Sequence, residues 1–326
     1  MIRKSPARIA AMLIALWAVW MAGTYGPLAP FVEAVKLRSS ETAAVSEELK
    51  GVGLKEWIEA EAAKRKIEPA DAVIDRVWKA IPGYNGREVD VHATYSRAKA
   101  LGVLPGSADF PWVYRELTAK VRLDDLPYMP IYRGNPAKPA VGLMINVAWG
   151  DEYLARMLKT LDKEKVKATF FFDGTWLAKH KELAAEMMAK GHELSNHAYT
   201  HPDMSKLSLQ RQKEEIGKTE ALLKELGAGN KWFAPPSGDY DARTVRAASE
   251  FGLRTVLWTI DTIDWKNPPS SAVVAKIAAR VGPGNLILMH PTKASDGALS
   301  GMIEAIRAKG YAPGTVSEAL SPRRTF

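Results

Sequence analysis

Residues 140–173 read AVGLMINVAWGDEYLARMLKTLDKEKVKATFFFD, and this stretch decides the fold class. An apolar run leads through a polar loop into a segment with apolar residues at helical spacing, and a second apolar run follows. That order of strand, loop, helix and strand is typical of two parallel strands joined by a crossover helix. The loop NVAWGDEY, at 146–153, stands where α/β enzymes usually carry their catalytic groups.

The same alternation continues to the C-terminus. Expected strands lie in AVGLMINV, KATFFFD, HELSNHA, KWFAPP, RTVLWTID and NLILMHP, each followed by an amphipathic helical segment. This pattern predicts an α/β fold of parallel strands, either a (β/α) barrel or an open doubly wound sheet. Polar candidates follow the strands at Asn146, Asp173, His197, Asp261 and His290. Neither GxGxxG nor GxxxxGK[ST] occurs, which argues against a nucleotide site.

The N-terminal segment has the pattern of a membrane-targeting sequence. Arg3, Lys4 and Arg8 precede an uncharged, apolar stretch that ends at Glu33. We expect residues 1–35 to be a membrane anchor or a signal segment. A poor cleavage site favours an uncleaved anchor through residues 9–30, with the main domain outside the cytoplasmic membrane. Cleavage would instead make the protein secreted.

Three further segments follow the N-terminal one. Residues 36–70 are polar and rich in alanine, which predicts a helical spacer. Residues 71–125 predict a small α+β unit, in which VIDRVWKAI and REVDVHATY form a β-hairpin around PGYNG and a short helix follows. Residues 126–326 hold the repeating strand–helix pattern and form the main domain.

Composition narrows the chemistry. The chain has no cysteine, which excludes disulfides, thiolate catalysis and zinc bound by cysteine. Its net charge is +8, but Lys and Arg are spread along the chain and often stand near Glu, as on solvated helix faces. No nucleic-acid motif accompanies this charge, so we expect no nucleic-acid partner. No protein partner can be deduced.

Two groups of residues could carry a reaction. His197 and His201 are four residues apart in HELSNHAYTHPD, so a helical turn or a tight loop could aim both at one metal. Asp261 and Asp264 follow one strand and His290 ends another. A carboxylate beside His290 would orient its ring for proton transfer. Judged singly, each of these residues has an ordinary structural explanation.

Judged together, the motifs resemble the polysaccharide deacetylase family, carbohydrate esterase family 4, with its NodB-homology domain. KATFFFDG, GHELSNHAYTHPDMSKLS and DTIDWKNP carry the resemblance, which covers about residues 139–320. MINVAWG and KWFAPPSG are similar to the sporulation-associated branch of the family. The resemblance implies a distorted, incomplete (β/α) barrel. It also implies a divalent metal, usually zinc, that activates water to remove acetyl groups from chitin-like or peptidoglycan sugars.

The resemblance assigns roles to individual residues. His197 and His201 match the metal-binding histidines, His290 matches the catalytic acid, and Asp261 matches the carboxylate that holds His290. The implied substrate pocket contains Trp265, Leu288 and Pro235.

The chain also departs from the family pattern. A gapless comparison with the first motif, T-F-D-D, places Asn146 at the catalytic base and Val147 at the metal-binding Asp. Asn does not take up a proton at neutral pH and Val does not bind a metal. Ala234 replaces the Arg that pairs with the base. Asp173 is a tentative surrogate for the missing carboxylate, or else a turn-forming residue before Gly174.

Two functions therefore follow from the sequence. The favoured one is a metal-dependent hydrolase that deacetylates an N-acetylated polysaccharide of the cell envelope, with a divergent, impaired site. The alternative is a catalytically silent protein that binds glycans on the same fold.

Overall fold

The computed structural model describes residues 53–324, together with Trp17, Met21, Tyr25, Gly26, Ala29, Pro30 and Glu33. The predicted anchor therefore lies largely outside the described residues, as does the first part of the predicted spacer. Within the described part of the chain, no helix is both long and apolar enough to cross a bilayer. The chain divides into two units: residues 53–67 with 87–115, and residues 68–86 with 116–324.

The smaller unit is built on two helices, α3 (Leu54–Arg65) and α4 (Val91–Leu101). Its buried apolar residues are Ile58, Val89, Ala98 and Phe110. The helix α4 begins at Val91 because the Asp90 side chain accepts a hydrogen bond from Ala93 N, 2.9 Å away. The prediction that VHATY is a strand is therefore wrong, since a helix cap precedes it.

The predicted hairpin around PGYNG is also not formed. Strand β1 (Val73–Asp75) pairs with β2 (Lys79–Ile81) in antiparallel fashion, so both strands of this hairpin come from VIDRVWKAI. The Asp75 carboxylate accepts hydrogen bonds from Val77 N and Trp78 N and closes the turn between them. Strand β3 (Gly86–Val89) instead pairs with β4 (Tyr114–Leu117).

The larger unit contains an eight-stranded sheet in the order β10-β11-β5-β6-β7-β8-β9, with β12 also paired to β5. Every pair is parallel, as the strand–helix alternation predicts. The strands are β5 (Ala140–Val147), β6 (Thr169–Phe172), β7 (Glu193–Asn196), β8 (Trp232–Phe233), β9 (Arg254–Thr255), β10 (Ile260–Asp261), β11 (Leu286–Met289) and β12 (Ala312–Gly314).

The sheet curls into an incomplete barrel. Strands β9 and β10 stand at opposite ends of the strand order, yet residues 256–259 alone separate them in sequence. Four residues reach at most about 18 Å, so the two ends of the sheet must lie close together. This arrangement confirms the predicted α/β class and is consistent with the distorted barrel.

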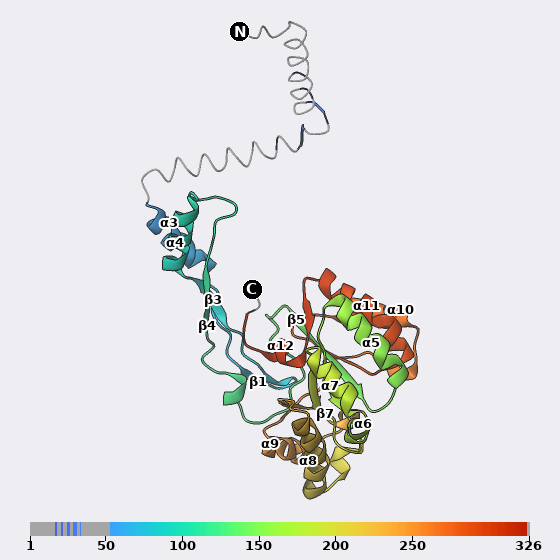
Figure 1. Ribbon diagram of the computed structural model, residues 1–326. Helices are drawn as coiled ribbons and strands as arrows, with labels where there is room; N and C mark the ends of the chain where they lie inside the picture. Colours follow the sequence, from blue (N-terminus) through green and yellow to red (C-terminus); the bar gives the residue numbers. More distant parts are fainter. Residues whose placement is uncertain are drawn as a thin grey trace, which may run out of the picture. The chain divides into compact units, whose positions relative to one another are not determined.

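Helices cover the outside of the sheet, and α5, α10 and α11 lie together on one side (Figure 1). The α-helices of this unit are α5 (Asp151–Glu164), α6 (Gly174–Lys179), α7 (Lys181–Ala189), α8 (Leu209–Glu225), α9 (Ala242–Glu250), α10 (Ser270–Arg280), α11 (Lys293–Ala308) and α12 (Val316–Leu320). Short 3₁₀ helices occur at η1 (Leu123–Asp125), η2 (Met204–Lys206), η3 (Pro236–Gly238) and η4 (Asp264–Lys266).

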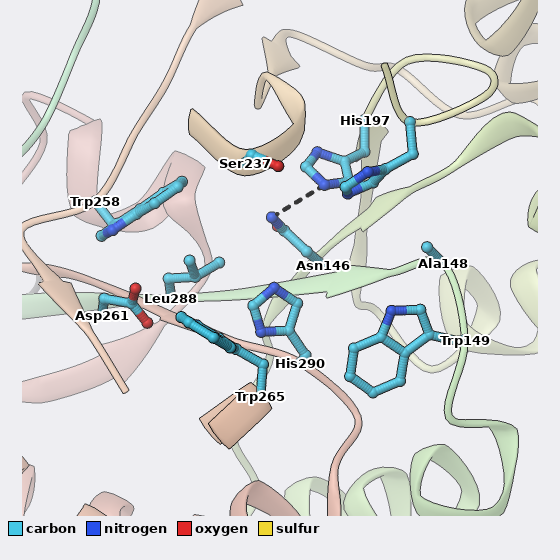
Figure 2. Close-up of a pocket in the computed structure, with 11 residues that line it drawn as sticks. Asn146, Ala148, Trp149, His197, Ser237, Trp258, Asp261, Trp265, Leu288 and His290 are labelled. Atoms are coloured by element: carbon cyan, nitrogen blue, oxygen red, sulfur yellow. Dashed lines mark hydrogen bonds between the residues drawn. The ribbon is translucent and has the colours of Figure 1, made fainter. Parts of the chain in front are cut away.

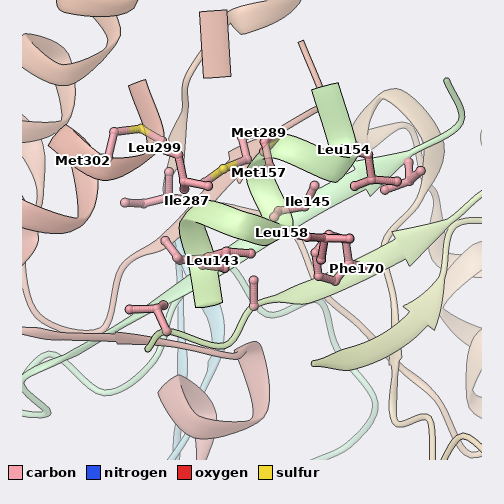
Figure 3. Packing of buried hydrophobic residues seen from close by; sticks show 14 of the residues in the cluster. Leu143, Ile145, Leu154, Met157, Leu158, Phe170, Ile287, Met289, Leu299 and Met302 are labelled. Atoms are coloured by element: carbon pink, nitrogen blue, oxygen red, sulfur yellow. The ribbon is translucent and has the colours of Figure 1, made fainter. Parts of the chain in front are cut away.

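The main core lies between the sheet and these helices. Figure 3 shows Leu143 and Ile145 of β5 packed with Leu154 and Leu158 of α5, and Val147 belongs to the same buried cluster. Side chains alternate along a strand. Asn146 must therefore point to the opposite face, into the barrel, where Met144 also lies.

One buried histidine of this core predicts acid sensitivity. His192 is 4% exposed, and its Nδ1 accepts a hydrogen bond from Ala168 N at 3.2 Å. Burial, and then the charge of Lys167, lower the pKa of His192 to about 4 from its ordinary value of 6.5. Between these values the unfolded chain binds the extra proton, so unfolding becomes easier as pH falls.

We expect His192 to remove up to about 3 kcal/mol from the free energy of unfolding as pH falls from 6.5 to 4. Urea titrations at several pH values measure this slope, with His192→Gln as the variant that cannot titrate. Identical slopes for the two proteins over this range would contradict the prediction.

Candidate functional site

A pocket of about 380 Å³ opens at the carboxyl ends of the parallel strands (Figure 2). Its lining residues come from strand ends and the loops after them: Asn146, Ala148, Trp149, His197, His201, Ser237, Trp258, Asp261, Trp265, Leu288 and His290. Its size suits a small ligand or part of a polymer. The fold thus brings together residues that are distant in sequence, on the face where the sequence predicts function.

His197 is buried and its proton position is fixed by the backbone. Its Nδ1 lies 2.7 Å from the carbonyl oxygen of Ala234, which can only accept a hydrogen bond, so Nδ1 carries the proton. Nε2 therefore presents a lone pair, and Asn146 Nδ2 donates to it at 3.3 Å. Burial, and then repulsion from His201, lower the pKa of His197 to about 3, so the ring is neutral at physiological pH.

His201 stands next to His197 because of a tight loop, one of the two arrangements that the sequence allows. The ring centroids are 5.1 Å apart. The backbone of His201 is left-handed, with φ of 56°. The buried Glu215 carboxylate accepts hydrogen bonds from Tyr199 N and Thr200 N, and so holds the loop against α8. Glu215 of α8 therefore helps to position His201, which lies in the loop before this helix.

His290 is held by Asp264, and the predicted pairing with Asp261 is wrong. Asp264 Oδ1 lies 2.8 Å from His290 Nδ1, and Asp264 Oδ2 accepts from His290 N at 2.6 Å. Although burial acts in the opposite direction, hydrogen bonds from His290 bring the pKa of Asp264 below its usual value. The carboxylate therefore stays charged and orients the His290 ring with Nε2 free.

Asp261 lines the pocket in a different role. Its Oδ1 accepts a hydrogen bond from Ile263 N at 2.7 Å, which closes the turn that leads into η4. Ile263 has a φ of 58°, a strained conformation for a β-branched residue. This turn moves Asp264, rather than Asp261, beneath His290.

Asp173 does not restore the missing carboxylate. It is 3% exposed and caps the helix α6, accepting hydrogen bonds from Trp176 N at 2.9 Å and from the Thr175 hydroxyl. It is absent from the pocket lining. The turn-forming alternative is therefore correct, because the cap directs the carboxylate into the start of α6.

The predicted substrate pocket is recovered in part. Trp265 and Leu288 line the cavity, whereas Pro235 is buried and only precedes η3. The sequence did not identify Trp258, Ser237 or Trp149 as site residues. The aromatic residue in NVAWGDEY was the available signal for Trp149, whose ring stacks on His290 at a centroid distance of 5.9 Å.

The structure shows where the side chains that match the first family motif point. Val147 is fully buried in the apolar core and does not reach the pocket, so it cannot stand at a metal-binding position. Ala148 and Trp149 do line the pocket. Ile145, which matches the Phe of T-F-D-D without a gap, faces the same core, and Asn146 lines the pocket beside His197. The placement of Asn146 at the base position therefore stays a prediction.

The described residues do not fit the predicted zinc ion. No group of three or more His, Asp or Glu side chains in residues 53–324 could hold a metal. A zinc site needs at least three protein ligands, and here two imidazoles have no carboxylate beside them. The lone pair of His197 already accepts a hydrogen bond from the Asn146 amide.

Known proteins are similar to this chain in sequence and in structure. A family model described as polysaccharide deacetylase matches residues 133–256. The uncharacterised protein YlxY of Bacillus subtilis is 43% identical over 264 residues, which cover 81% of this chain and 82% of the relative.

Two further proteins carry functional descriptions. A peptidoglycan-N-acetylglucosamine deacetylase of Bacillus cereus is 30% identical and matches 55% of this chain and 65% of its own length. A crystal structure described as a CE4 family pseudoenzyme from Bacillus anthracis is 40% identical with a TM-score of 0.79. That match covers 83% of this chain and 96% of the other.

Proposed function

The chain belongs to the polysaccharide deacetylase family, carbohydrate esterase family 4, and on that premise we propose that its pocket binds an amino-sugar polymer of the cell envelope without hydrolysing it. One observation carries the proposal. Asn146 donates a hydrogen bond to the His197 lone pair, and no described carboxylate stands beside the two histidines. Hydrolysis in this family generally depends on a metal, and these residues do not build its site.

The rest of the pocket is suited to a sugar. Trp149, Trp258 and Trp265 line it with large aromatic surfaces, and Leu288 adds an apolar contact. Aromatic rings pack against the C–H faces of a pyranose ring, while Asp261 and Ser237 offer polar contacts to its substituents. The peptidoglycan deacetylase among the relatives points to peptidoglycan or a chitin-like polymer as the ligand.

Hydrolysis is the second candidate function, and the His290–Asp264 pair favours it. His290 Nε2 faces the pocket with Nδ1 held by a charged carboxylate, the arrangement that delivers a proton to a departing sugar amine. The reaction would consume water and give acetate and a free amine. Among the described residues, no base stands at the predicted position to activate the attacking water, because Asn146 cannot take up a proton.

Acetate release and glycan binding separate the two functions. We expect the full chain to sediment with insoluble peptidoglycan in the presence of chelator and to release no acetate from N-acetylated chitooligosaccharide when zinc is supplied. Metal analysis of the purified protein should find no stoichiometric zinc. Zinc-dependent acetate release that disappears in His201→Ala would overturn the proposal of glycan binding without hydrolysis and would favour the hydrolase.

The binding has its own matched control. Trp265→Ala should weaken glycan binding about tenfold through loss of an aromatic contact. Phe251→Ala removes an exposed aromatic side chain of the same unit outside the pocket and should leave the affinity unchanged. Equal losses in both variants would indicate adhesion to the surface rather than binding in the pocket.

The proposed location follows from the N-terminal sequence. Residues 9–30 would hold the protein in the cytoplasmic membrane and place the deacetylase-like domain outside it, next to the envelope polymer. Fractionation and protease protection of intact cells test this orientation. Recovery of the whole chain in the cytosol would contradict it.

A further inference from the structure

The groups that line the pocket favour a cation over a neutral acetamide. No lining residue is Lys or Arg, and Asp261 contributes a carboxylate. Three tryptophan rings surround the remaining space. A carboxylate together with several aromatic faces is the combination that recognises organic ammonium groups.

The Asp261 carboxylate is available to bind an ammonium group. Within residues 53–324, Ile263 N donates a hydrogen bond to it, and no Lys or Arg forms an ion pair with it. The carboxylate is partly buried and lies in the same part of the pocket as Trp258, Trp265 and Leu288 (Figure 2). A partly desolvated charge next to apolar rings gains most from a cation in direct contact.

The ring of Trp265 already accommodates an ammonium group. The exposed Lys266 Nζ lies 4.9 Å from the centroid of the Trp265 ring, and Lys266 is outside the pocket lining. Attraction between a cation and an indole face is among the stronger cation–π contacts of proteins. A ligand ammonium at Asp261 would have Trp258 as a further aromatic neighbour (Figure 2).

The hydrogen-bonding groups of the two possible ligands give a second comparison. Asn146 lines the pocket, but its Oδ1 atom is buried, so a ligand does not reach it as an acceptor. An acetamido group brings one N–H and a carbonyl oxygen that needs a donor. A protonated amine brings three N–H donors and no acceptor. The Asp261 carboxylate, whose Oδ2 accepts no hydrogen bond within residues 53–324, therefore matches the amine better.

We infer that this pocket, if it binds an amino-sugar polymer as proposed above, selects sugars whose amine is free over sugars whose amine is acetylated. The ligand is then the product of a deacetylation, and a separate N-deacetylase must supply it. The change of preference has a physical reason. A bound metal cation would repel an ammonium group, whereas within residues 53–324 no Lys or Arg pairs with the Asp261 carboxylate, and the Lys266 ammonium over the Trp265 ring lies outside the pocket lining.

The test compares two oligosaccharides of equal length, one fully N-acetylated and one fully deacetylated. Calorimetric titration of the full chain, at a pH below the pKa of the sugar amine, should show about tenfold tighter binding of the deacetylated oligomer. The protein's net charge of +8 repels a polycation at long range, so a preference in this direction must come from the pocket.

Two variants locate the preference. Asp261→Asn keeps an oxygen acceptor for Ile263 N, and it should weaken binding of the deacetylated oligomer about tenfold, so that the deacetylated and acetylated oligomers bind with similar affinity. Lys266→Gln removes a nearby positive charge and should tighten binding of the deacetylated oligomer about twofold.

Each remaining outcome has a meaning. Equal or tighter binding of the acetylated oligomer overturns this inference and leaves the proposed glycan-binding function intact. Absence of binding to both oligomers overturns the proposed function itself, and the inference with it. A preference that survives in Asp261→Asn shows that the amine is recognised elsewhere and also overturns the inference.

Discussion

Replacing Ala148 and Trp149 by aspartate together is expected to create a zinc site and acetate-releasing activity, both of which we propose to be absent from the natural chain. His197, His201 and one new carboxylate would supply three protein ligands, the number found in catalytic zinc sites. The second carboxylate would serve as base opposite the His290–Asp264 pair. Metal analysis and an acetate assay on N-acetylated chitooligosaccharide measure the gain, which should be the largest effect of any change at this pocket.

The matched comparison is Asn146→Asp with Val147→Asp, the pair that a gapless comparison of the first motif suggests. Val147 is fully buried among apolar residues on the helix side of the sheet. A carboxylate there should lower the free energy of unfolding by about 3 kcal/mol or more and should bind no metal. Zinc binding by this pair, and none by the Ala148 and Trp149 pair, would show that the metal-binding position is Val147, as the gapless comparison predicts.

The second large effect concerns stability. Asp264→Ala should lower the free energy of unfolding by about 3–5 kcal/mol, because it leaves several buried donors without an acceptor. Asp264 is fully buried and accepts hydrogen bonds from His290 N, His290 Nδ1, the Thr292 hydroxyl and the Ser295 hydroxyl. Chemical denaturation measures the loss.

Asp261→Ala is the control for this experiment. Asp261 is partly exposed and, within residues 53–324, accepts one hydrogen bond, from Ile263 N. Its removal should therefore lower the free energy of unfolding by no more than about 1 kcal/mol. The two residues lie three apart in DTIDW, and the two predictions differ severalfold. Similar losses would mean that Asp264 does not anchor the loop on which His290 depends.

The structure agrees with the family resemblance on the histidines of the site and on two residues of its pocket. His197, His201 and His290 meet in one pocket, as their motifs indicate, and Trp265 and Leu288 line it. It differs at the carboxylates that the family pattern requires, since neither Asp173 nor Val147 lines the pocket. This difference is the reason why we propose that the pocket binds a glycan without hydrolysing it.

The sequence alone was sufficient for the larger fold. The repeated strand–helix alternation predicted parallel strands, and the positions of polar residues after those strands predicted the functional face. Hydrophobic periodicity carries this information because each strand and helix must bury its own apolar face. Sequence was less informative for residues 71–101, where side-chain caps at Asp75 and Asp90 redirect the backbone against the strand pattern.

Only the tertiary structure decided which carboxylate holds His290, which residues after β5 face the pocket, and whether Asp173 could replace the missing acid. These outcomes depend on single turns: the strained Ile263 carries Asp264 rather than Asp261 under the ring, and the α6 cap turns Asp173 away. Local sequence determines that a polar residue follows a strand, because that requires only burial and spacing. Its direction depends on hydrogen bonds to partners distant in the chain, such as those between Asp264 and His290, and these exist only after folding.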